Sequence, residues 1–519
     1  MADTNLELLG KRAAGHAEAG DWDAARADWL RVLDIVPGSP DAMLELSYVD
    51  SLAGRYRTAR DWAIRAAAAG PRTASAMSSL VKRLRTFNET EVLHAFALRL
   101  AGDPQAPPGV LVECAMQLSN LNDFDLALRC AEAAVARAPA DPAARLVRGQ
   151  LLASHGRTDE AASEIDGVLE RNPRIATGWW MLSRLRRQTP GSNHVPQLRR
   201  LLATPGLRPG DVAAAGRALH KELDDLGDHE GAWTALQALC KAMRDNVRYD
   251  AAETRRLIEA LVAWSPRGMP ATPPTASGRT PVFIVGMHRS GTTLVEQMLD
   301  ASPRVRGLGE LYDFTAAMRE ATDHACRFPI DLGIVERARD VDFATVGRRY
   351  LDGVAWRLDD ESHFTDKQPA NFLNLGFICQ ALPQAKILHM VRDPVETCFS
   401  NLRELFSGVN EYSYDQRELA DYFLQYRRLM AHWHALFPGR ILDVDYARLT
   451  THPESAMREV AGFCGIDYID AMRSTGSSTR AVGTASGVQV REEVAARSVP
   501  KWQPYERHLQ PLREALGLA

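Results

Sequence analysis

The sequence predicts two domains, an all-α solenoid over residues 1–262 and an α/β domain with a parallel sheet over residues 282–519. Three observations support this fold class. Small residues, alanines and prolines recur with a 34-residue period in the first half. Residues 263–281 are rich in proline, glycine, serine and threonine, which predicts a linker. Short apolar runs then alternate with amphipathic helical stretches, as in sheets built from parallel strands.

The first half contains a repeat. Its landmarks are Gly20, Ala25, Trp29 and Pro37, followed 34 residues later by Gly54, Ala59, Ala63 and Pro71. A second register starts with Asn122, Ala127, Ala134 and Pro139 and continues with Gly156, Ala161, Val168 and Pro173. This is the tetratricopeptide spacing, with a small turn residue, a close alanine contact and a terminating proline. Residues 86–107 are expected to form a degenerate repeat, and residues 224–243 a further repeat or a cap. A compact irregular helical domain is the alternative.

Composition limits the class of protein. Hydrophobic residues make up 45% and charged residues 25% of the chain, as in globular proteins, and the net charge of -4 gives no sign of a nucleic-acid partner. The seven cysteines are odd in number and form no C-x-x-C pair, which argues against a zinc site and against a secreted disulfide framework, and favours buried thiols in a reducing compartment. The N-terminus has no apolar signal region and no long uncharged apolar run occurs, so we expect a cytoplasmic protein without a membrane span.

The second half has the pattern of an α/β domain. Residues 281–286, 386–391 and 440–446 are short apolar runs enriched in β-branched residues, and residues 418–437 form an amphipathic helical stretch. Buried strands that alternate with helices predict a parallel sheet with right-handed crossovers.

A glycine-rich loop, GMHRSGTT, joins the predicted strand 281–286 to a helix that begins near Thr292. Such a turn exposes backbone N–H groups and the positive end of the helix dipole to an anion. Gly286 and Gly291 permit the tight turn. The loop's hydroxyl and cationic side chains are Arg289, Ser290, Thr292 and Thr293, with His288 beside them. The segment is therefore predicted to bind an oxyanion.

The glycine spacing is that of the nucleoside-triphosphate loop G-x-x-x-x-G-K-[ST], but Thr292 stands where the lysine belongs. Such enzymes also need an aspartate directly after an apolar strand. None of the aspartates near later strands, Asp393, Asp443 and Asp445, has this simple context. A metal-dependent P-loop nucleotide kinase is therefore the weaker alternative. A requirement for magnesium would support it.

The loop, RSGTT followed by LVEQML, resembles the 5′-phosphosulfate-binding loop of the sulfotransferases. The segment KILHMVRDPVETCFSNL resembles the 3′-phosphate-binding segment of this family, with Arg392 at the strand end and Ser400 eight residues further on. A guanidinium can bind phosphate through two hydrogen bonds, and Ser400 lies about two helical turns away. The resemblance implies a P-loop-like α/β fold and metal-free transfer of a sulfuryl group from 3′-phosphoadenosine 5′-phosphosulfate (PAPS).

Within this family the chain is most similar to the protein-tyrosine sulfotransferase branch, and to bacterial proteins in which tetratricopeptide repeats precede such a domain. Glu310 follows Arg289 by 21 residues, and Lys367 lies in the sequence TDKQP. The resemblance implies that Glu310 is the catalytic base and that Lys367 and Arg289 contact the transferring group. The residues it implies for PAPS binding are Arg289, Ser290, Gly291, Thr292, Thr293, Arg392, Ser400, Tyr446, Ser486 and Lys501.

In-line sulfuryl transfer places negative charge on the oxygen that leaves with the phosphate, where Lys367, Arg289 and loop amides would stabilise it. Glu310 would accept the acceptor's proton. Each side chain also has a structural interpretation: a surface arginine, a capping glutamate or a solvated lysine. A catalytically degenerate, sulfotransferase-like scaffold or binding protein is the main alternative function.

The acceptor stays open at this stage. The resemblance favours a tyrosine of a peptide or protein, while a carbohydrate, lipid or secondary-metabolite hydroxyl is the alternative. The repeats suit recruitment of an acceptor or a partner protein, although some solenoids only pack on their own catalytic domain.

Overall fold

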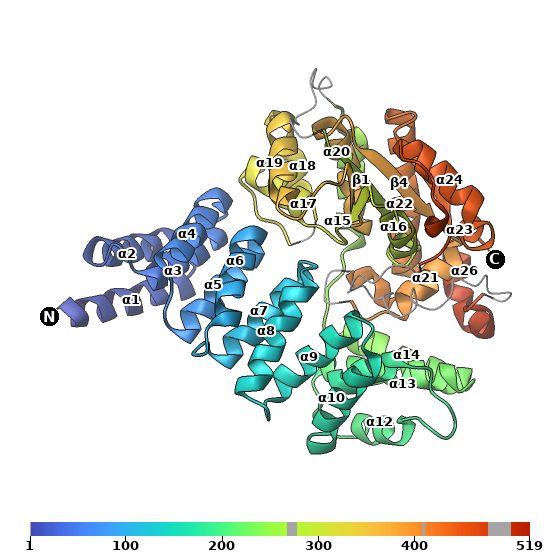
Figure 1. Cartoon of the computed structure of the whole chain (residues 1–519), viewed down its shortest axis with the longest axis horizontal. Coiled ribbons are helices and arrows are strands. Elements are labelled where there is room, and N and C mark those ends of the chain that lie inside the picture. Colours follow the sequence, from blue (N-terminus) through green and yellow to red (C-terminus); the bar gives the residue numbers. More distant parts are fainter. Residues whose placement is uncertain (1, 267–277, 328, 407–409, 476–499, 519) are drawn as a thin grey trace. The chain divides into compact units, whose positions relative to one another are not determined.

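The computed structural model of the chain describes residues 2–266, 278–327, 329–406, 410–475 and 500–518 (Figure 1). These residues form two compact units. One unit holds residues 2–147 together with 312–357, and the other holds the described residues of 148–266, 278–311 and 358–518. Each unit thus combines segments from both halves of the sequence. The domain limits at residues 262 and 281 stay a prediction from sequence patterns.

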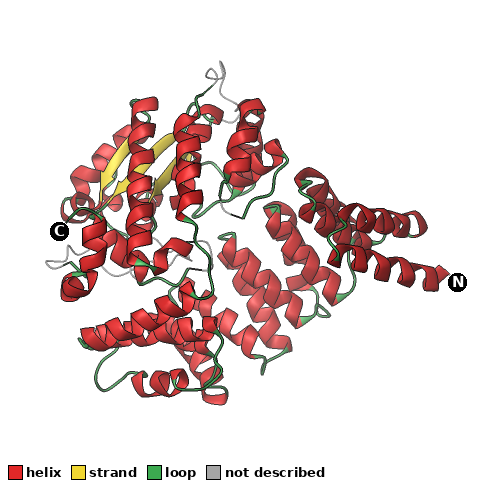
Figure 2. Ribbon diagram, turned by 180° about the vertical axis from the view of Figure 1, so that it is seen from behind, coloured by secondary structure: helices red, strands yellow, loops and turns green. Residues whose placement is uncertain are grey.

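The described residues before the sheet are helical, as Figure 2 shows in red. The helices are α1 (Ala2–Glu18), α2 (Trp22–Ile35), α3 (Pro40–Leu52), α4 (Tyr56–Ala69), α5 (Ala74–Thr86), α6 (Thr90–Gly102), α7 (Pro108–Asn120), α8 (Phe124–Arg137), α9 (Pro142–Ser154), α10 (Thr158–Arg171), α11 (Ala176–Leu185), α12 (Val195–Leu202), α13 (Pro209–Asp225), α14 (His229–Arg244) and α15 (Ala251–Ala263).

The first five helical hairpins share one turn conformation. Gly20, Gly54, Asn88, Asn122 and Gly156 have φ values of 76°, 75°, 56°, 61° and 79°. These residues are each 34 positions apart, so the repeat has one continuous register and the expected second register is wrong. Asn88 supplies the turn of the degenerate repeat, between α5 and α6. Glycine and asparagine occupy this position because they tolerate the left-handed region best.

The positions five residues after each turn are also periodic. Ala25, Ala59, Leu93, Ala127 and Ala161 are all fully buried. A small side chain there lets the two helices of a hairpin approach closely, and the copy with Leu93 shows why the sequence pattern weakens at that repeat. The all-α, tetratricopeptide-like part of the predicted fold is confirmed.

A five-stranded parallel sheet follows, with the order β2-β3-β1-β4-β5. The strands are β1 (Thr280–Gly286), β2 (Val305–Gly307), β3 (His363–Asp366), β4 (Lys386–Val391) and β5 (Ile441–Asp445). β1, β4 and β5 lie on the three apolar runs that predicted strands, and the α/β fold class is confirmed. β2 and β3 have only three and four residues, too short for an apolar pattern to stand out.

The helices of the second half are α16 (Thr292–Asp300), α17 (Asp313–Thr322), α18 (Leu332–Arg337), α19 (Phe343–Ala355), α20 (Leu375–Ala381), α21 (Pro394–Leu402), α22 (Gln416–Leu436), α23 (Tyr446–Thr451), α24 (Pro453–Cys464) and α26 (Gln510–Ala515). Short 3₁₀ segments are η1 (Ala338–Asp340), η2 (Pro369–Asn374), η3 (Glu411–Tyr414), η4 (Asp470–Arg473) and η5 (Gln503–Leu509).

Helices cover both faces of the sheet (Figures 1 and 2). Ile284 and Leu388 of the sheet share one core with Val295 of α16 and Met457 of α24. Side chains alternate along a strand, so His389 of β4 points to the other face, where it bonds to α22. At the carboxyl edge, Gly286 of β1 pairs with Met390 of β4, which brings the segments after these strands together.

Two expectations from composition can be compared with the structure. None of the described helices is both long and apolar enough to cross a bilayer. All seven cysteines are free thiols, and five of them are buried, as expected for thiols outside a disulfide framework.

Candidate active site

The glycine-rich loop begins at the carboxyl end of β1 and has a constrained backbone. Gly286, Arg289 and Gly291 have φ values of 150°, 68° and 108°. A Cβ atom on Gly286 would lie 2.9 Å from the carbonyl oxygen of Met390, and one on Gly291 would lie 2.4 Å from Cδ2 of Tyr446. Only glycine fits at these two positions, so the loop packs directly against β4 and the residue that follows β5.

Polar groups at the start of α16 are arranged for an anion. The helix begins at Thr292, so its first backbone N–H groups have no partner within the helix. Ser290 is 1% exposed, and its hydroxyl forms no hydrogen bond to any described residue. Thr292 and Thr293 are buried beside it. A buried hydroxyl without a partner at a helix N-terminus favours an anionic ligand.

Arg289 points from the loop into a buried charge cluster. Its Nε donates to Oγ of Ser400 at 3.3 Å, and its Nη1 lies 3.8 Å from a carboxylate oxygen of Glu404. Burial lowers the pKa of Arg289, while the charge of Glu404 opposes that effect. Ser400, which the resemblance pairs with Arg392, thus bonds to Arg289 in the structure, and the nearby carboxylate of Glu404 is one that the sequence analysis had not identified.

Glu404 is shared with an arginine from the helical half of the sequence. Nη2 of Arg217, in α13, lies 3.3 Å from Oε2 of Glu404, and both side chains are buried. Burial tends to raise the pKa of Glu404, but the charges of Arg217 and Arg289 outweigh it and the net shift is downward. Burial lowers the pKa of Arg217 to about 10. Glu404 thus links α13 to the loop, within one compact unit.

Arg392 lies on the other side of the loop. Its Nη1 donates to the carbonyl oxygen of Arg289 at 2.9 Å, and its Nη2 donates to Glu396 at 2.9 Å. The guanidinium carbon is 4.3 Å from the centre of the Tyr446 ring, a cation–π distance. Arg392 and Tyr446 are thus placed beside residues 289–291, and their predicted contacts with PAPS stay a prediction.

Glu310 and Lys367 form an ion pair. Lys367 Nζ lies 2.7 Å from Oε1 of Glu310; the lysine side chain is fully buried and that of Glu310 is 34% exposed. Burial tends to raise the pKa of Glu310, but the charge of Lys367 and its hydrogen bond lower it more, so the net pKa shift is downward. Glu310 is therefore ionised at neutral pH. The backbone N–H of Lys367 also donates to the carbonyl of Gly309 at 2.9 Å.

The pKa of His288, a loop residue, depends on the charges of both members of this ion pair. Burial lowers its pKa to about 4; the charge of Glu310 opposes this shift, and those of Lys367 and Arg289 reinforce it. The imidazole is therefore neutral at neutral pH. Asn401 donates to the backbone carbonyl of His288 at 2.7 Å, which fixes the entrance of the loop.

A second buried glutamate holds the segment that carries Glu310. Oε1 of Glu296, in α16, accepts a hydrogen bond from the N–H of Gly309 at 2.8 Å and one from the hydroxyl of Thr365 at 2.9 Å. Glu296 is only 3% exposed. The sequence analysis quoted this residue within LVEQML but assigned it no role, although a glutamate in an otherwise apolar helix start was a usable signal.

For two predicted donor-binding residues, Lys501 and Ser486, no contact with this site is described. Lys501 is partly buried and precedes η5, and Ser486 falls outside the described residues. Their roles stay predictions from the resemblance.

Comparisons with known proteins agree with this geometry. Residues 281–470 match the model of the sulfotransferase family, and residues 115–176 match a tetratricopeptide-repeat model. The chain therefore contains a region similar to the sulfotransferase family, preceded by a region similar to tetratricopeptide repeats.

Among curated proteins, an uncharacterized protein of Aquifex aeolicus is 33% identical over 337 residues, which cover 62% of this chain and 43% of that protein. Protein-tyrosine sulfotransferase 2 of Gallus gallus is 27% identical over 201 residues, 37% of this chain and 52% of that protein. The chain thus spans about half the length of these relatives. The sulfotransferase domain of an olefin synthase from Synechococcus PCC 7002 is 18% identical with a TM-score of 0.31, covering 47% of this chain and 98% of that domain.

Proposed function

We propose that the chain transfers a sulfuryl group from PAPS to an acceptor hydroxyl. One observation carries the proposal: the loop bears Arg289 and a buried Ser290 hydroxyl that bonds to no described residue, and the Glu310–Lys367 ion pair lies near enough to its His288 to act on it. The charges of both members of this pair act on His288 of the same loop. Candidate anion-binding groups and a candidate base are thus both near one short segment.

The residues fit the two anionic ends of PAPS. Ser290, the amides at the start of α16 and Arg289 would hold the phosphosulfate. Arg392 and Ser400 would hold the 3′-phosphate, and the Tyr446 ring beside Arg392 offers a surface for the adenosine. None of these groups needs a metal ion to bind phosphate oxygens.

PAPS supplies the sulfuryl group: the acceptor oxygen bonds to sulfur as the bridging sulfur–oxygen bond breaks, and the electron pair leaves with 3′-phosphoadenosine 5′-phosphate (PAP). Lys367 and Arg289 are suited to stabilise the charge that develops on the leaving oxygen. Glu310 accepts the proton that the acceptor hydroxyl loses.

The ion pair itself suggests how the base is activated. While Lys367 bonds to Glu310, the carboxylate is a weak base with a lowered pKa. If Lys367 turns toward the anionic donor, Glu310 loses this ion pair, and the removal of the nearby positive charge raises the pKa of Glu310. Donor binding would thereby convert Glu310 into a stronger base before transfer.

We propose tyrosine in a peptide or protein as the acceptor, because the curated relative from Gallus gallus is a protein-tyrosine sulfotransferase. The repeats would recruit the acceptor or a partner. The test is incubation of the full chain with ³⁵S-labelled PAPS, tyrosine-containing peptides and a lysate of the source organism, in the presence of EDTA. Label in peptide or protein is the expected result.

Other outcomes separate the alternatives. Label only in a glycan or a small molecule would change the acceptor class. Tight PAP binding without transfer to any acceptor would indicate a degenerate scaffold, and magnesium-dependent phosphoryl transfer from ATP would indicate a kinase. Either of these last two outcomes would overturn the proposal.

A further inference from the structure

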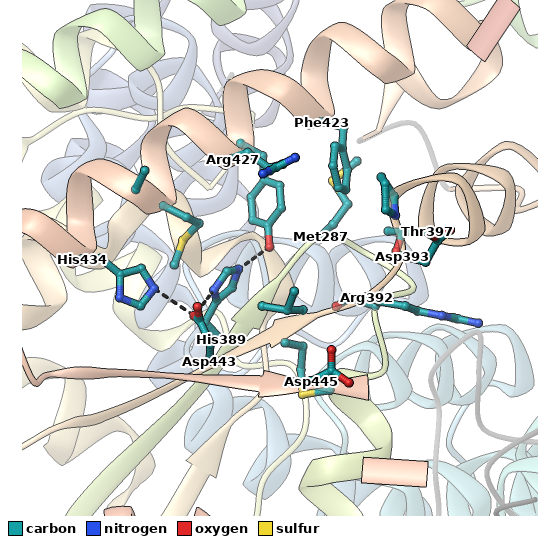
Figure 3. Close-up of a pocket in the computed structure, with 17 residues that line it drawn as sticks. Met287, His389, Arg392, Asp393, Thr397, Phe423, Arg427, His434, Asp443 and Asp445 are labelled. Carbon is teal, nitrogen blue, oxygen red and sulfur yellow. Dashed lines mark hydrogen bonds and ion pairs between the residues drawn. The ribbon is translucent and has the colours of Figure 1, made fainter. Parts of the chain in front are cut away.

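A pocket of about 520 Å³ lies on the α22 side of the sheet (Figure 3). Its walls come from β4, β5, α21 and α22, and at one end it reaches Met287 and Ser290 of the glycine-rich loop. The other end holds two histidines and an aspartate, His389, His434 and Asp443, which have no part in the proposed transfer. Three different elements supply these side chains, β4, α22 and β5.

The three side chains converge on one point. Nδ1 of His389 lies 2.7 Å from Oδ1 of Asp443, and Nε2 of His434 lies 2.9 Å from the same oxygen. One donor atom from each residue falls within 4.8 Å of the other two. Figure 3 shows both imidazoles turned toward the carboxylate. Two imidazole nitrogens and one carboxylate oxygen are a donor set that suits Zn²⁺.

The fold fixes the position of His389 and Asp443. The two residues are partners in the β4–β5 register, so their side chains emerge side by side on the same face. His389 is 8% exposed, whereas His434 and Asp443 are 36% and 54% exposed, so the cluster is buried on one side and open on the other. Three protein ligands with an open side leave room for a fourth ligand such as water.

Tyr426 orients the buried histidine. Its hydroxyl bonds to Nε2 of His389, the ring nitrogen that does not face Asp443. Metal-binding histidines commonly use their second nitrogen in this way, which fixes the ring orientation. The backbone of Met287 lies beside the same hydroxyl, and both residues line the pocket, so the cluster also adjoins the glycine-rich loop.

We propose that His389, His434 and Asp443 bind one Zn²⁺ ion. The hydrogen-bonded contacts of 2.7 and 2.9 Å must widen to about 3.4 Å for a tetrahedral ion with ligand bonds near 2.1 Å, a small movement for the two exposed side chains. The ion takes no part in sulfuryl transfer. Its role is to fix β5 and α22 and, through Tyr426, the entrance of the loop.

The test is calorimetric titration of the EDTA-dialysed full chain with ZnCl₂, with MgCl₂ in a parallel titration. One Zn²⁺ per chain is expected, with a rise in the thermal unfolding midpoint, and no binding of Mg²⁺, which prefers oxygen ligands. His434→Gln and Asp443→Asn should weaken Zn²⁺ binding at least tenfold. Tyr426→Phe should weaken it on the order of 10–100-fold.

His432→Gln is the matched control, because it removes a histidine from the same helix that lies outside the cluster. It should leave Zn²⁺ binding unchanged. His434 is partly exposed, so its replacement is expected to leave the fold intact, which the thermal midpoint of the metal-free variant checks. Equal Zn²⁺ affinity in wild type and in His434→Gln, or Mg²⁺ binding as tight as Zn²⁺ binding, would overturn the proposal.

Discussion

At the residue scale, the candidate site contains charged side chains that each lie beside a side chain of opposite charge. Lys367 is paired with Glu310, and Arg289 shares Glu404 with Arg217. Buried charges without partners are strongly destabilising, so removal of one member affects stability as well as chemistry. For each substitution, the binding affinity or the stability of the variant therefore has to be measured as well as its rate of transfer.

Glu310→Gln should reduce the rate of sulfuryl transfer on the order of 10²–10⁴-fold, because an amide cannot accept the acceptor's proton. The amide oxygen can still accept a hydrogen bond from Lys367, so the fold and PAP binding should be preserved. Radiolabel transfer gives the rate and calorimetry gives the PAP affinity. Glu459→Gln, at an exposed site in α24, should behave as wild type. Retained transfer in a folded Glu310→Gln would exclude this role.

Arg392→Gln should raise the KM for PAPS roughly 10–100-fold, because hydrogen bonds to charged groups contribute about 1.5–3 kcal/mol. The effect on kcat should be smaller, since Arg392 contacts the loop through the carbonyl of Arg289 and not through the ion pair. Steady-state kinetics at varied PAPS would show this. An unchanged KM for PAPS with a reduced kcat would contradict a role of Arg392 in PAPS binding.

The lowered pKa of His288 makes stability depend on pH. Burial favours the neutral imidazole and holds the folded-state pKa at about 4, below the usual value of about 6.5. This contribution to stability is complete above pH 6.5 and is lost as the pH falls toward 4. His288→Asn should therefore flatten the decline in the free energy of unfolding between these values. Urea unfolding at several pH values measures it; identical pH profiles for the two proteins would contradict the assignment.

At the element scale, the loop is held by helices that flank it as well as by the strands. Glu296 of α16 fixes the segment before Glu310, and Glu404, just after α21, joins the loop to α13. Contacts of this kind connect positions far apart in sequence. They explain how Arg289, a candidate site residue, depends on a helix from the repeat-containing half.

Glu404→Gln should destabilise the folded chain by about 3 kcal/mol, because it leaves Arg217 and Arg289 buried without their carboxylate. Arg217→Met should cost less, since Glu404 keeps Arg289 as a partner and methionine fills similar space. Urea unfolding curves of the two variants give both values. A larger loss for Arg217→Met than for Glu404→Gln would contradict this account.

At the scale of the whole molecule, the compact units interleave the two halves of the sequence. In one unit, Glu89 of the repeats pairs with Arg349 at 2.9 Å, and Thr90 bonds to Trp356 at 3.1 Å. In the other, Asp224 of α13 lies 3.3 Å from Arg403. Each of these contacts joins a residue that precedes the predicted linker to a residue that follows it.

Residues 278–519 expressed alone should therefore not fold as a cooperative unit. Helices α17 to α19 would lose the partners supplied by residues 2–147, and α21 and α22 would lose those supplied by α13 to α15. Thermal unfolding and size-exclusion chromatography, with the full chain as control, would test this. A monomeric fragment that unfolds cooperatively and binds PAP would show that these contacts are dispensable.

Much of the fold follows from local patterns. The turn residues at 34-residue spacing require left-handed backbone, and the apolar runs at 281–286 and 386–391 become central strands. The loop residues, Arg392 and Tyr446 meet because the carboxyl ends of neighbouring parallel strands lie at one edge. The very short strands β2 and β3 could not be read from sequence, because three or four residues carry no periodic signal.

The repeat period, the α/β pattern, the glycine-rich loop and the candidates Arg289, Glu310, Lys367 and Arg392 could be predicted from local sequence, because each depends on spacing within a short segment. Three features became visible only in the folded chain: Lys367 pairs with Glu310, Glu404 joins Arg217 to Arg289, and His389, His434 and Asp443 converge. These contacts join residues from separate elements, and their energy depends on burial, which appears only when the chain has folded.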